Sequence, residues 1–273
     1  MIPAAFDYVR VDSAAEAVDA LVEHGDEAKL LAGGHSLVPL MKLRLATPTV
    51  LVDIGRLDDL AGVRRDGDTV VVGAMTRHHE LETSVVLAES CPLLPFVAGQ
   101  VGDPQVRRRG TIGGSIAHGD PASDLPAAVL ALGAMLVVEG PSGRREIAAD
   151  DFFLGFLETA LAPDELLVEL RIPEHRGGWS FQKFTRRAQD WAIVAVAAVT
   201  GNRVGVGLVN MGVTPLRAGA VEAAIANGSE LATAADLAAE GTEPSADLHA
   251  SVEFREHLAR VLTRRALLEA TAR

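Results

Sequence analysis

Two short glycine-rich segments, at 32–36 and 111–115, constrain this chain more than any other feature. The first follows the apolar run 29–32 and is therefore expected where a buried strand ends. Glycine carries no Cβ, so an anionic oxygen can closely approach the backbone N–H groups of such a segment. His35 and Ser36 add side-chain donors to the first segment. A tight turn without a ligand is the alternative interpretation of a Gly-Gly pair.

The second segment belongs to a longer polar stretch, residues 102–126, which predicts a long structured loop. Gly113 and Gly114 are again expected to free backbone donors, while Thr111 and Ser115 supply hydroxyl groups. A loop of this length inside a compact chain is more often functional than idle.

Several charged side chains near the second segment admit more than one interpretation. Asp120 and Asp124 can accept hydrogen bonds from ribose or ribityl hydroxyls, but with His118 they also match the ligand types of a metal site. Asp124 is equally suited to be the N-cap of a following helix. The arginine run 107–109 is expected to be a solvated charged surface, with steering of an anion or a partner as the alternative. His78, at a predicted helix start, is expected to be exposed and inert.

The succession of helix and strand signals predicts an α+β fold in three parts, residues 1–56, 57–175 and 176–273. The first part is typical of a β-α-β-type unit whose helix begins after a serine N-cap. In the third part, Gly205 and Gly207 alternate within a strand pattern. They make no dinucleotide fingerprint, because neither a third glycine nor a helix follows them.

Charge and cysteine content exclude several classes of protein. A formal net charge of −12 argues against a nucleic-acid surface, which needs a basic face. Cys91 is the only cysteine, so the chain can form no intrachain disulfide and hold no iron–sulfur cluster of its own. The N-terminal residues lack the features of a signal peptide, and no apolar run reaches the length of a membrane span. We therefore expect a cytoplasmic protein, with the inner face of the membrane as an alternative location.

Four segments of the chain resemble the FAD-binding subunit of the molybdenum hydroxylases, and in particular the medium subunits of the aerobic carbon monoxide dehydrogenase type. They are AGGHSLVPLMKLRLATP at 32–48, VGAMT at 72–76, RRRGTIGGSIAHGDPASDLPAAVLALGA at 107–134 and DELLVELRIP at 164–173. The resemblance implies a two-subdomain FAD-binding domain of the vanillyl-alcohol oxidase (PCMH) type. It also implies a C-terminal α+β domain of the carbon monoxide dehydrogenase flavoprotein type.

The resemblance further implies which residues contact FAD. It assigns the pyrophosphate and adjacent groups to the two glycine segments, and a ribityl or ribose hydroxyl to Asp124. Trp191 stands where the family has a tyrosine near the isoalloxazine, a place from which it could control access to the ring. The complete implied set is Ala32, Gly33, Gly34, His35, Ser36, Leu37, Met75, Thr76, Thr111, Ile112, Gly113, Gly114, Ser115, His118, Asp124, Leu167, Lys183 and Trp191.

Three of these residues depart from the family pattern. Ser115 and His118 each stand where the family commonly has an asparagine, and Trp191 replaces the tyrosine. Both Ser115 and His118 can form hydrogen bonds, so FAD binding is expected to persist with a differently tuned flavin potential. Because tryptophan replaces tyrosine beside the isoalloxazine, an external electron acceptor is expected to approach the flavin differently.

The family resemblance also implies partners and a division of labour. Substrate oxidation would occur at a molybdopterin centre in a large subunit, and electrons would pass through two [2Fe–2S] clusters in a small subunit. This chain would receive the electrons on FAD and pass them to a quinone, NAD⁺ or O₂, within a dimer of heterotrimers. No side chain need act as an acid or base. The alternatives are a self-sufficient flavin oxidoreductase of the vanillyl-alcohol oxidase class and a binding or assembly module without cofactor.

Overall fold

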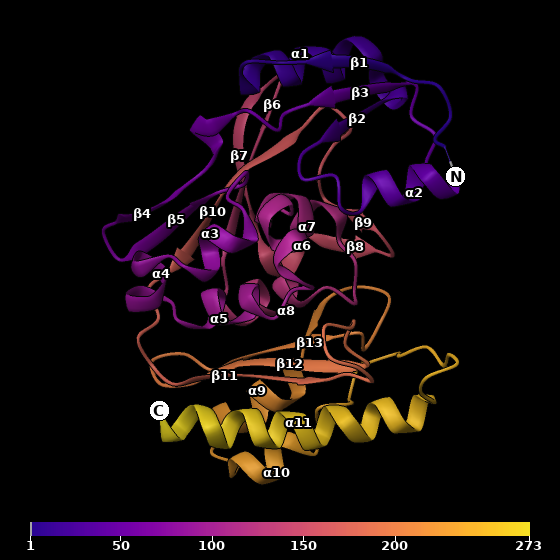
Figure 1. The fold of residues 1–273 in the computed structure, drawn as a ribbon. Helices are drawn as coiled ribbons and strands as arrows, with labels where there is room; N and C mark the ends of the chain where they lie inside the picture. Colours follow the sequence, from indigo (N-terminus) through magenta and orange to yellow (C-terminus); the bar gives the residue numbers. More distant parts are fainter. Residues whose placement is uncertain (1) are drawn as a thin grey trace.

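The computed structural model describes residues 2–273, which form three main sheets and one small hairpin. The sheets follow one another in chain order from the top to the bottom of the view in Figure 1, with the long C-terminal helix beneath the last. This mixture of helices and sheets confirms the predicted α+β class. The division of the chain at residues 56 and 175 stays a proposal, with which the three sheets are consistent.

The first sheet is parallel, in the order β1-β3-β2. Its elements are β1 (Asp7–Arg10), α1 (Ala14–His24), β2 (Ala28–Leu31), α2 (Leu37–Leu43) and β3 (Val50–Asp53). The α1 helix begins as predicted, because the Ser13 side chain accepts a hydrogen bond from the Glu16 N–H at 3.1 Å. Strand β1 was not anticipated from the sequence, since its residues DYVR are mostly exposed and show no apolar run.

The second sheet is antiparallel, in the order β4-β5-β10-β6-β7. Its strands are β4 (Val63–Asp66), β5 (Thr69–Gly73), β6 (Met135–Gly140), β7 (Gly143–Ala148) and β10 (Leu166–Pro173). The hairpin of β8 (Phe153–Gly155) and β9 (Glu158–Thr159) lies within the same part of the chain. So do the helices α3 (His78–Glu82), α4 (Val85–Ser90), α5 (Leu93–Gly99), α6 (Pro104–Arg109), α7 (Ile112–His118) and α8 (Asp124–Leu132).

The stretch 102–126 differs from the long loop that the sequence predicted. It contains the whole of α6 and α7 and the first turn of α8. Asp103 caps α6 by accepting a hydrogen bond from the Val106 N–H at 2.9 Å, and Thr111 caps α7 in the same way. These helices span only six and seven residues, too few for an apolar repeat to show in the sequence.

The third sheet separates two helices. It consists of β11 (Trp179–Phe184), β12 (Val194–Val199), β13 (Gly205–Val209) and β14 (Leu216–Arg217), paired in that order. In Figure 1, α8 lies above this sheet and α11 (Val252–Ala272) below it, with α9 (Gly219–Ala226) and α10 (Leu231–Ala235) on the α11 side. Every residue of β12 is buried, because both faces of the strand are covered.

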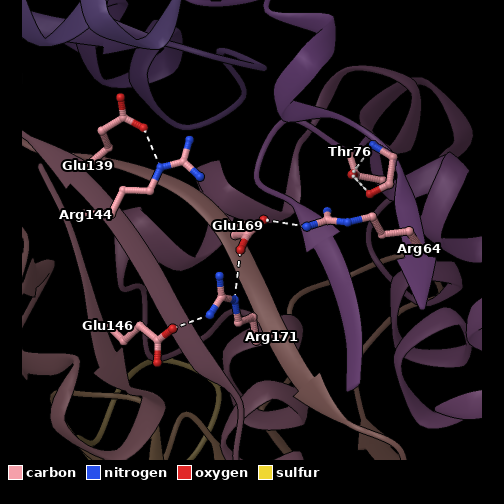
Figure 2. Close-up of polar contacts among 8 residues, drawn as sticks. Arg64, Thr76, Glu139, Arg144, Glu146, Glu169 and Arg171 are labelled. Carbon is pink, nitrogen blue, oxygen red and sulfur yellow. Dashed lines mark hydrogen bonds and ion pairs between the residues drawn. The ribbon is translucent and has the colours of Figure 1, made fainter. Parts of the chain in front are cut away.

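One face of the second sheet is divided between an apolar contact and a charged surface. Val137, Leu166 and Val168 pack into the same hydrophobic cluster as residues of the first sheet. Further along the face, Figure 2 shows Glu169 between Arg64 and Arg171. The Glu169 carboxylate accepts hydrogen bonds from the Arg64 guanidinium at 3.3 Å and from Arg171 Nε at 2.9 Å. Ion pairs at such a surface each contribute little to stability, so the apolar contact is what joins the two sheets. Among the described helices, none combines the length and apolar character needed to cross a membrane.

Candidate functional site

The first glycine segment forms the connection from β2 to α2 and presents a row of unused backbone donors. Gly34 has a positive φ of 75°, and the helix begins where the Val38 N–H donates to the Gly34 carbonyl at 3.0 Å. Within residues 2–273, the N–H groups of 33–37 donate to no protein acceptor. Successive free N–H groups at the start of a helix are a favourable site for an anion. These free donors are consistent with the use predicted for Gly33, Gly34, His35, Ser36 and Leu37, which together with Ala32 stay proposed FAD contacts.

The second segment differs from the expectation that Gly113 and Gly114 free backbone donors. The N–H groups of Ile112 and Gly113 donate to Thr76 O at 3.0 Å and Ala74 O at 2.8 Å. The N–H of Gly114 donates to the Thr111 hydroxyl at 3.1 Å. Gly113 is required for packing instead, because a Cβ there would lie 2.5 Å from the Cβ of Ala74.

The two glycine segments lie against each other. A Cβ on Gly33 would collide with the carbonyl oxygen of Arg109, two residues before Thr111. The Arg77 guanidinium holds this junction together, because it donates to the carbonyls of Arg109 and Gly55. The structure thus places the end of the first sheet beside the start of α7, as a shared cofactor site requires.

His78 is a site residue that the sequence interpretation missed. It was expected to be exposed, yet it is only 3% exposed, and its Nε2 lies 3.3 Å from the Ser115 hydroxyl. Burial lowers the pKa of His78 to about 4, with the neighbouring His35 contributing, so the imidazole is neutral near pH 7. One sequence signal could have revealed this burial. His78 stands three residues before Leu81, which places both on the buried face of α3.

Asp124 is the first residue of α8, not its N-cap, and it forms a buried ion pair across to the third sheet. Its Oδ2 accepts a hydrogen bond from Lys183 Nζ at 2.6 Å, and Lys183 also donates to the Gln100 carbonyl at 3.2 Å. The second oxygen, Oδ1, is buried and has no partner in residues 2–273. Burial raises the pKa of Asp124 to about 6 against the opposing effect of Lys183. Oδ1 is therefore an open acceptor suited to a hydroxyl group.

The remaining predicted contacts fall into a buried and an accessible group. Met75, Thr76 and Leu167 are buried, and the Thr76 hydroxyl already donates to the Gly73 carbonyl at 2.7 Å and accepts from the Gly62 N–H. Trp191, in the loop between β11 and β12, is 60% exposed. His118 ends α7 and is half-buried, which lowers its pKa.

Two of the charged-residue alternatives are resolved by the geometry. Over residues 2–273, no group of three or more His, Cys, Asp or Glu side chains is placed to hold a metal ion, so His118, Asp120 and Asp124 do not form a ligand set. Within the arginine run, Arg107 is not a solvated charge. Its Nε donates to Glu82 at 2.9 Å, and its guanidinium also donates to the carbonyls of Val101 and Gly102.

Comparison with known proteins gives two family matches that together cover almost the whole chain. Residues 4–175 match the FAD binding domain in molybdopterin dehydrogenase, and residues 179–270 match the CO dehydrogenase flavoprotein C-terminal domain. The carbon monoxide dehydrogenase medium chain of Hydrogenophaga pseudoflava is 43% identical over 100% of this chain and 99% of its own length. The nicotine 6-hydroxylase medium subunit of Paenarthrobacter nicotinovorans is 36% identical over 97% of this chain and 98% of its own.

Solved structures agree with these matches. The carbon monoxide dehydrogenase of Hydrogenophaga pseudoflava contains a chain that is 45% identical, with a TM-score of 0.95 and coverage of 100% of this chain and 99% of that one. The quinoline 2-oxidoreductase of Pseudomonas putida 86 gives 33% identity and a TM-score of 0.91, with the same coverage.

Fold and site define a flavin-binding component of an oxidoreductase. The chain belongs to the family of FAD-binding medium subunits of the molybdenum hydroxylases, which confirms the resemblance seen in its sequence. The residues present fit that cofactor. Free N–H groups at 33–37 suit the charge of a pyrophosphate, and the unpartnered Oδ1 of Asp124 suits a sugar or ribityl hydroxyl.

Proposed function

We propose that this chain relays electrons within a complex of three kinds of subunit. A small [2Fe–2S] subunit would deliver the electrons, a large molybdopterin subunit would oxidise the substrate, and the assembly would be a dimer of heterotrimers. The observation that carries the proposal is a set of free donors and one free acceptor that suit FAD, on a chain whose only cysteine, Cys91, is buried. Because an iron–sulfur cluster needs several thiolates, any cluster that delivers electrons to this chain would have to lie on another chain. FAD supplies the redox chemistry, in that it can take up and release electrons.

The side chains and backbone of this chain would bind and orient the cofactor. The N–H groups of 33–37 would donate to the pyrophosphate, with Ser36 and Thr111 as neighbouring hydroxyls. Asp124 would accept from a ribityl or ribose hydroxyl while Lys183 balances its charge. Met75, Thr76 and Leu167 would act through packing, because their side chains are buried.

The other predicted contacts lie at the edges of this site. His35 and Ser115 lie close to His78, and Ser115 contacts its imidazole directly. Trp191 is the accessible aromatic side chain among the predicted contacts, and it would lie on the side from which an external acceptor approaches.

Purification through an affinity tag on this chain, from cells that express it natively, tests the proposal. We expect two further subunits to co-purify, with one FAD for each copy of the chain. When the partners are removed by mild denaturation, iron and molybdenum should be lost with them, while the FAD stays with this chain. Isolation of the chain without partners, or donor oxidation by the chain alone, would overturn the proposal and favour a self-sufficient flavin oxidoreductase.

A further inference from the structure

His78, the first residue of α3, is buried against the backbone that leads into α7. Its N–H donates to the Gly110 carbonyl at 3.0 Å. A Cβ on Gly110 would lie 2.6 Å from both Cδ2 and Nε2 of the imidazole, so the ring packs directly on this glycine. The ring is thereby held beside the start of α7.

The buried imidazole has one polar side-chain neighbour. Its Nε2 lies 3.3 Å from the Ser115 hydroxyl, and within residues 2–273 neither group has another side-chain hydrogen bond. The second ring nitrogen, Nδ1, is buried and has no partner in the same part of the chain. Because burial lowers the pKa of His78 to about 4, the ring is neutral near pH 7 and carries a single proton.

The two positions open to that proton differ in what they leave unpaired. A proton on Nδ1 would be a buried N–H donor without an acceptor, whereas a proton on Nε2 leaves only a lone pair on Nδ1 without a donor. Buried backbone N–H groups without an acceptor are rarer in native structures than carbonyls that lack a donor, and a ring N–H carries the same kind of cost. The hydrogen bond to Ser115 forms in either case, so the proton is favoured on Nε2.

This proton position determines what the Ser115 hydroxyl can do. A hydroxyl has one hydrogen to donate and two lone pairs with which to accept. When Nε2–H donates to Oγ, the hydroxyl hydrogen is not used by the imidazole and stays free for another acceptor. Ser115 is only partly buried, in contrast to His78, so its side chain is the member of the pair that can meet a ligand.

The Ser115 hydroxyl lies close to the first glycine segment. At the neighbouring Gly114, a Cβ would lie 3.9 Å from the Cβ of Ala32, which directly precedes the free N–H groups of 33–37. His35 of the same segment is near enough to His78 to contribute to its lowered pKa. A donor side chain at 115 therefore adds to a set of backbone donors that suit an anion.

We propose that His78 is a positioning residue for FAD. Its neutral imidazole donates Nε2–H to Ser115 Oγ and thereby leaves the Ser115 hydroxyl hydrogen to donate to the FAD diphosphate. His78 itself does not touch the cofactor and acts only through Ser115. This inference rests on the proposed function, because it concerns the same FAD site.

Two substitutions of His78 separate this role from a loss of packing. Glutamine carries its amide N–H groups about as far from the backbone as Nε2, whereas asparagine reaches only as far as Nδ1. FAD is titrated into the flavin-depleted complex and its fluorescence is followed. His78→Asn and Ser115→Ala should each raise the Kd about tenfold, the effect of one hydrogen bond to a charged group, while His78→Gln should stay within about threefold of wild type.

His79→Asn is the matched control, because His79 lies on the same helix with a side chain that is 40% exposed and contacts Glu82. Its Kd for FAD should equal that of wild type. Equal losses in His78→Asn and His78→Gln, or an unchanged Kd in His78→Asn, would overturn the inference.

A double variant tests whether His78 acts through Ser115. With both Ser115→Ala and His78→Asn, the Kd should be about tenfold above wild type, as for Ser115→Ala alone, instead of about a hundredfold. A full additional loss from His78→Asn in the Ser115→Ala background would show an independent structural effect and would overturn the inference.

ADP is the probe for the group that the Ser115 hydroxyl meets, because ADP carries a diphosphate without the isoalloxazine. It should compete with FAD, and its inhibition constant should rise about tenfold in both Ser115→Ala and His78→Asn. An unchanged constant for ADP would overturn the assignment to the diphosphate. A wild-type complex that binds no FAD would instead overturn the proposed function itself.

Discussion

At the scale of single residues, the site contains two groups, His78 and Asp124, whose pKa is shifted by burial. Burial beside Ser115 keeps His78 neutral near pH 7, and burial raises the pKa of Asp124 to about 6 in spite of its contact with Lys183. Neither property follows from the residue types. Both follow from tertiary packing, which buries His78 beside Ser115 of α7 and Asp124 beside Lys183 of β11.

The buried imidazole predicts a specific dependence of stability on pH. In the unfolded chain His78 takes up a proton below about pH 6.5. In the folded chain it does so only near pH 4, so the free energy of unfolding falls as the pH drops through this window. The difference corresponds to roughly 3 kcal/mol. Urea denaturation at neutral pH and near pH 4 should therefore show a smaller loss for His78→Gln than for wild type. Equal losses in both proteins would contradict the assignment.

Substitutions in the first glycine segment should separate folding from cofactor binding. Gly33→Ala is expected to lower stability by on the order of 2 kcal/mol, because the new Cβ collides with the Arg109 carbonyl. Ser36→Ala removes one hydroxyl donor without a collision and should raise the Kd for FAD about tenfold. Ser229→Ala, at an exposed position, is the control. Flavin absorbance titration measures the affinity, and an unchanged Kd in Ser36→Ala would exclude this hydroxyl from the site.

At the scale of elements, α8 is the helix that joins the flavin-binding part to the third sheet. It lies above that sheet in Figure 1, and its backbone contacts strand β13 where Gly205 and Gly207 leave room. The alternating glycines therefore have a structural role in close packing and take no part in nucleotide recognition.

This contact predicts a strong asymmetry between two glycine substitutions. In Gly207→Ala the added Cβ would collide with the Ala127 carbonyl of α8, which should lower the free energy of unfolding by on the order of 2–3 kcal/mol. In Gly219→Ala nothing lies within 4 Å of the added Cβ, and alanine favours the helix α9 that begins there. Chemical denaturation should show a clear loss for the first variant and little change or a small gain for the second. Similar effects at both positions would argue against the close contact.

Elements with a strong local signal were predictable from sequence, and the short ones were not. The α1 helix has its Ser13 cap, and the apolar runs of β10 and β12 are long enough to be recognised. Strand β1 and the helices α6 and α7 lack such signals, because their conformation depends on tertiary contacts and caps.

The candidate site was predictable only in part for a related reason. A glycine pair at a strand end indicates free donors, and the first segment has them. The same pair in α7 serves helix packing, because its N–H groups donate to the Ala74 carbonyl and the Thr111 hydroxyl. Sequence alone does not distinguish the two uses, since the difference lies in which backbone approaches the glycine.

At the scale of the whole molecule, the residues of the proposed FAD site come from all three parts of the chain. The junction of the first two parts carries the proposed anion-binding segment, α8 carries the acceptor Asp124, and the third part carries Lys183 and the exposed Trp191. A cofactor that contacts all of these residues would link the parts, so FAD binding should stabilise the chain by mass action. A rise in Tm with increasing FAD concentration measures this coupling. Its absence would show that the cofactor does not contact the folded chain as proposed.

We propose that electrons reach this chain from a partner subunit. The most direct measurement of this transfer is the flavin absorbance of the FAD-loaded chain after anaerobic mixing with the prereduced iron–sulfur subunit. We expect the oxidised flavin bands to disappear, and to persist when the iron–sulfur subunit is omitted. Flavin that stays oxidised in the presence of the reduced subunit would contradict this transfer.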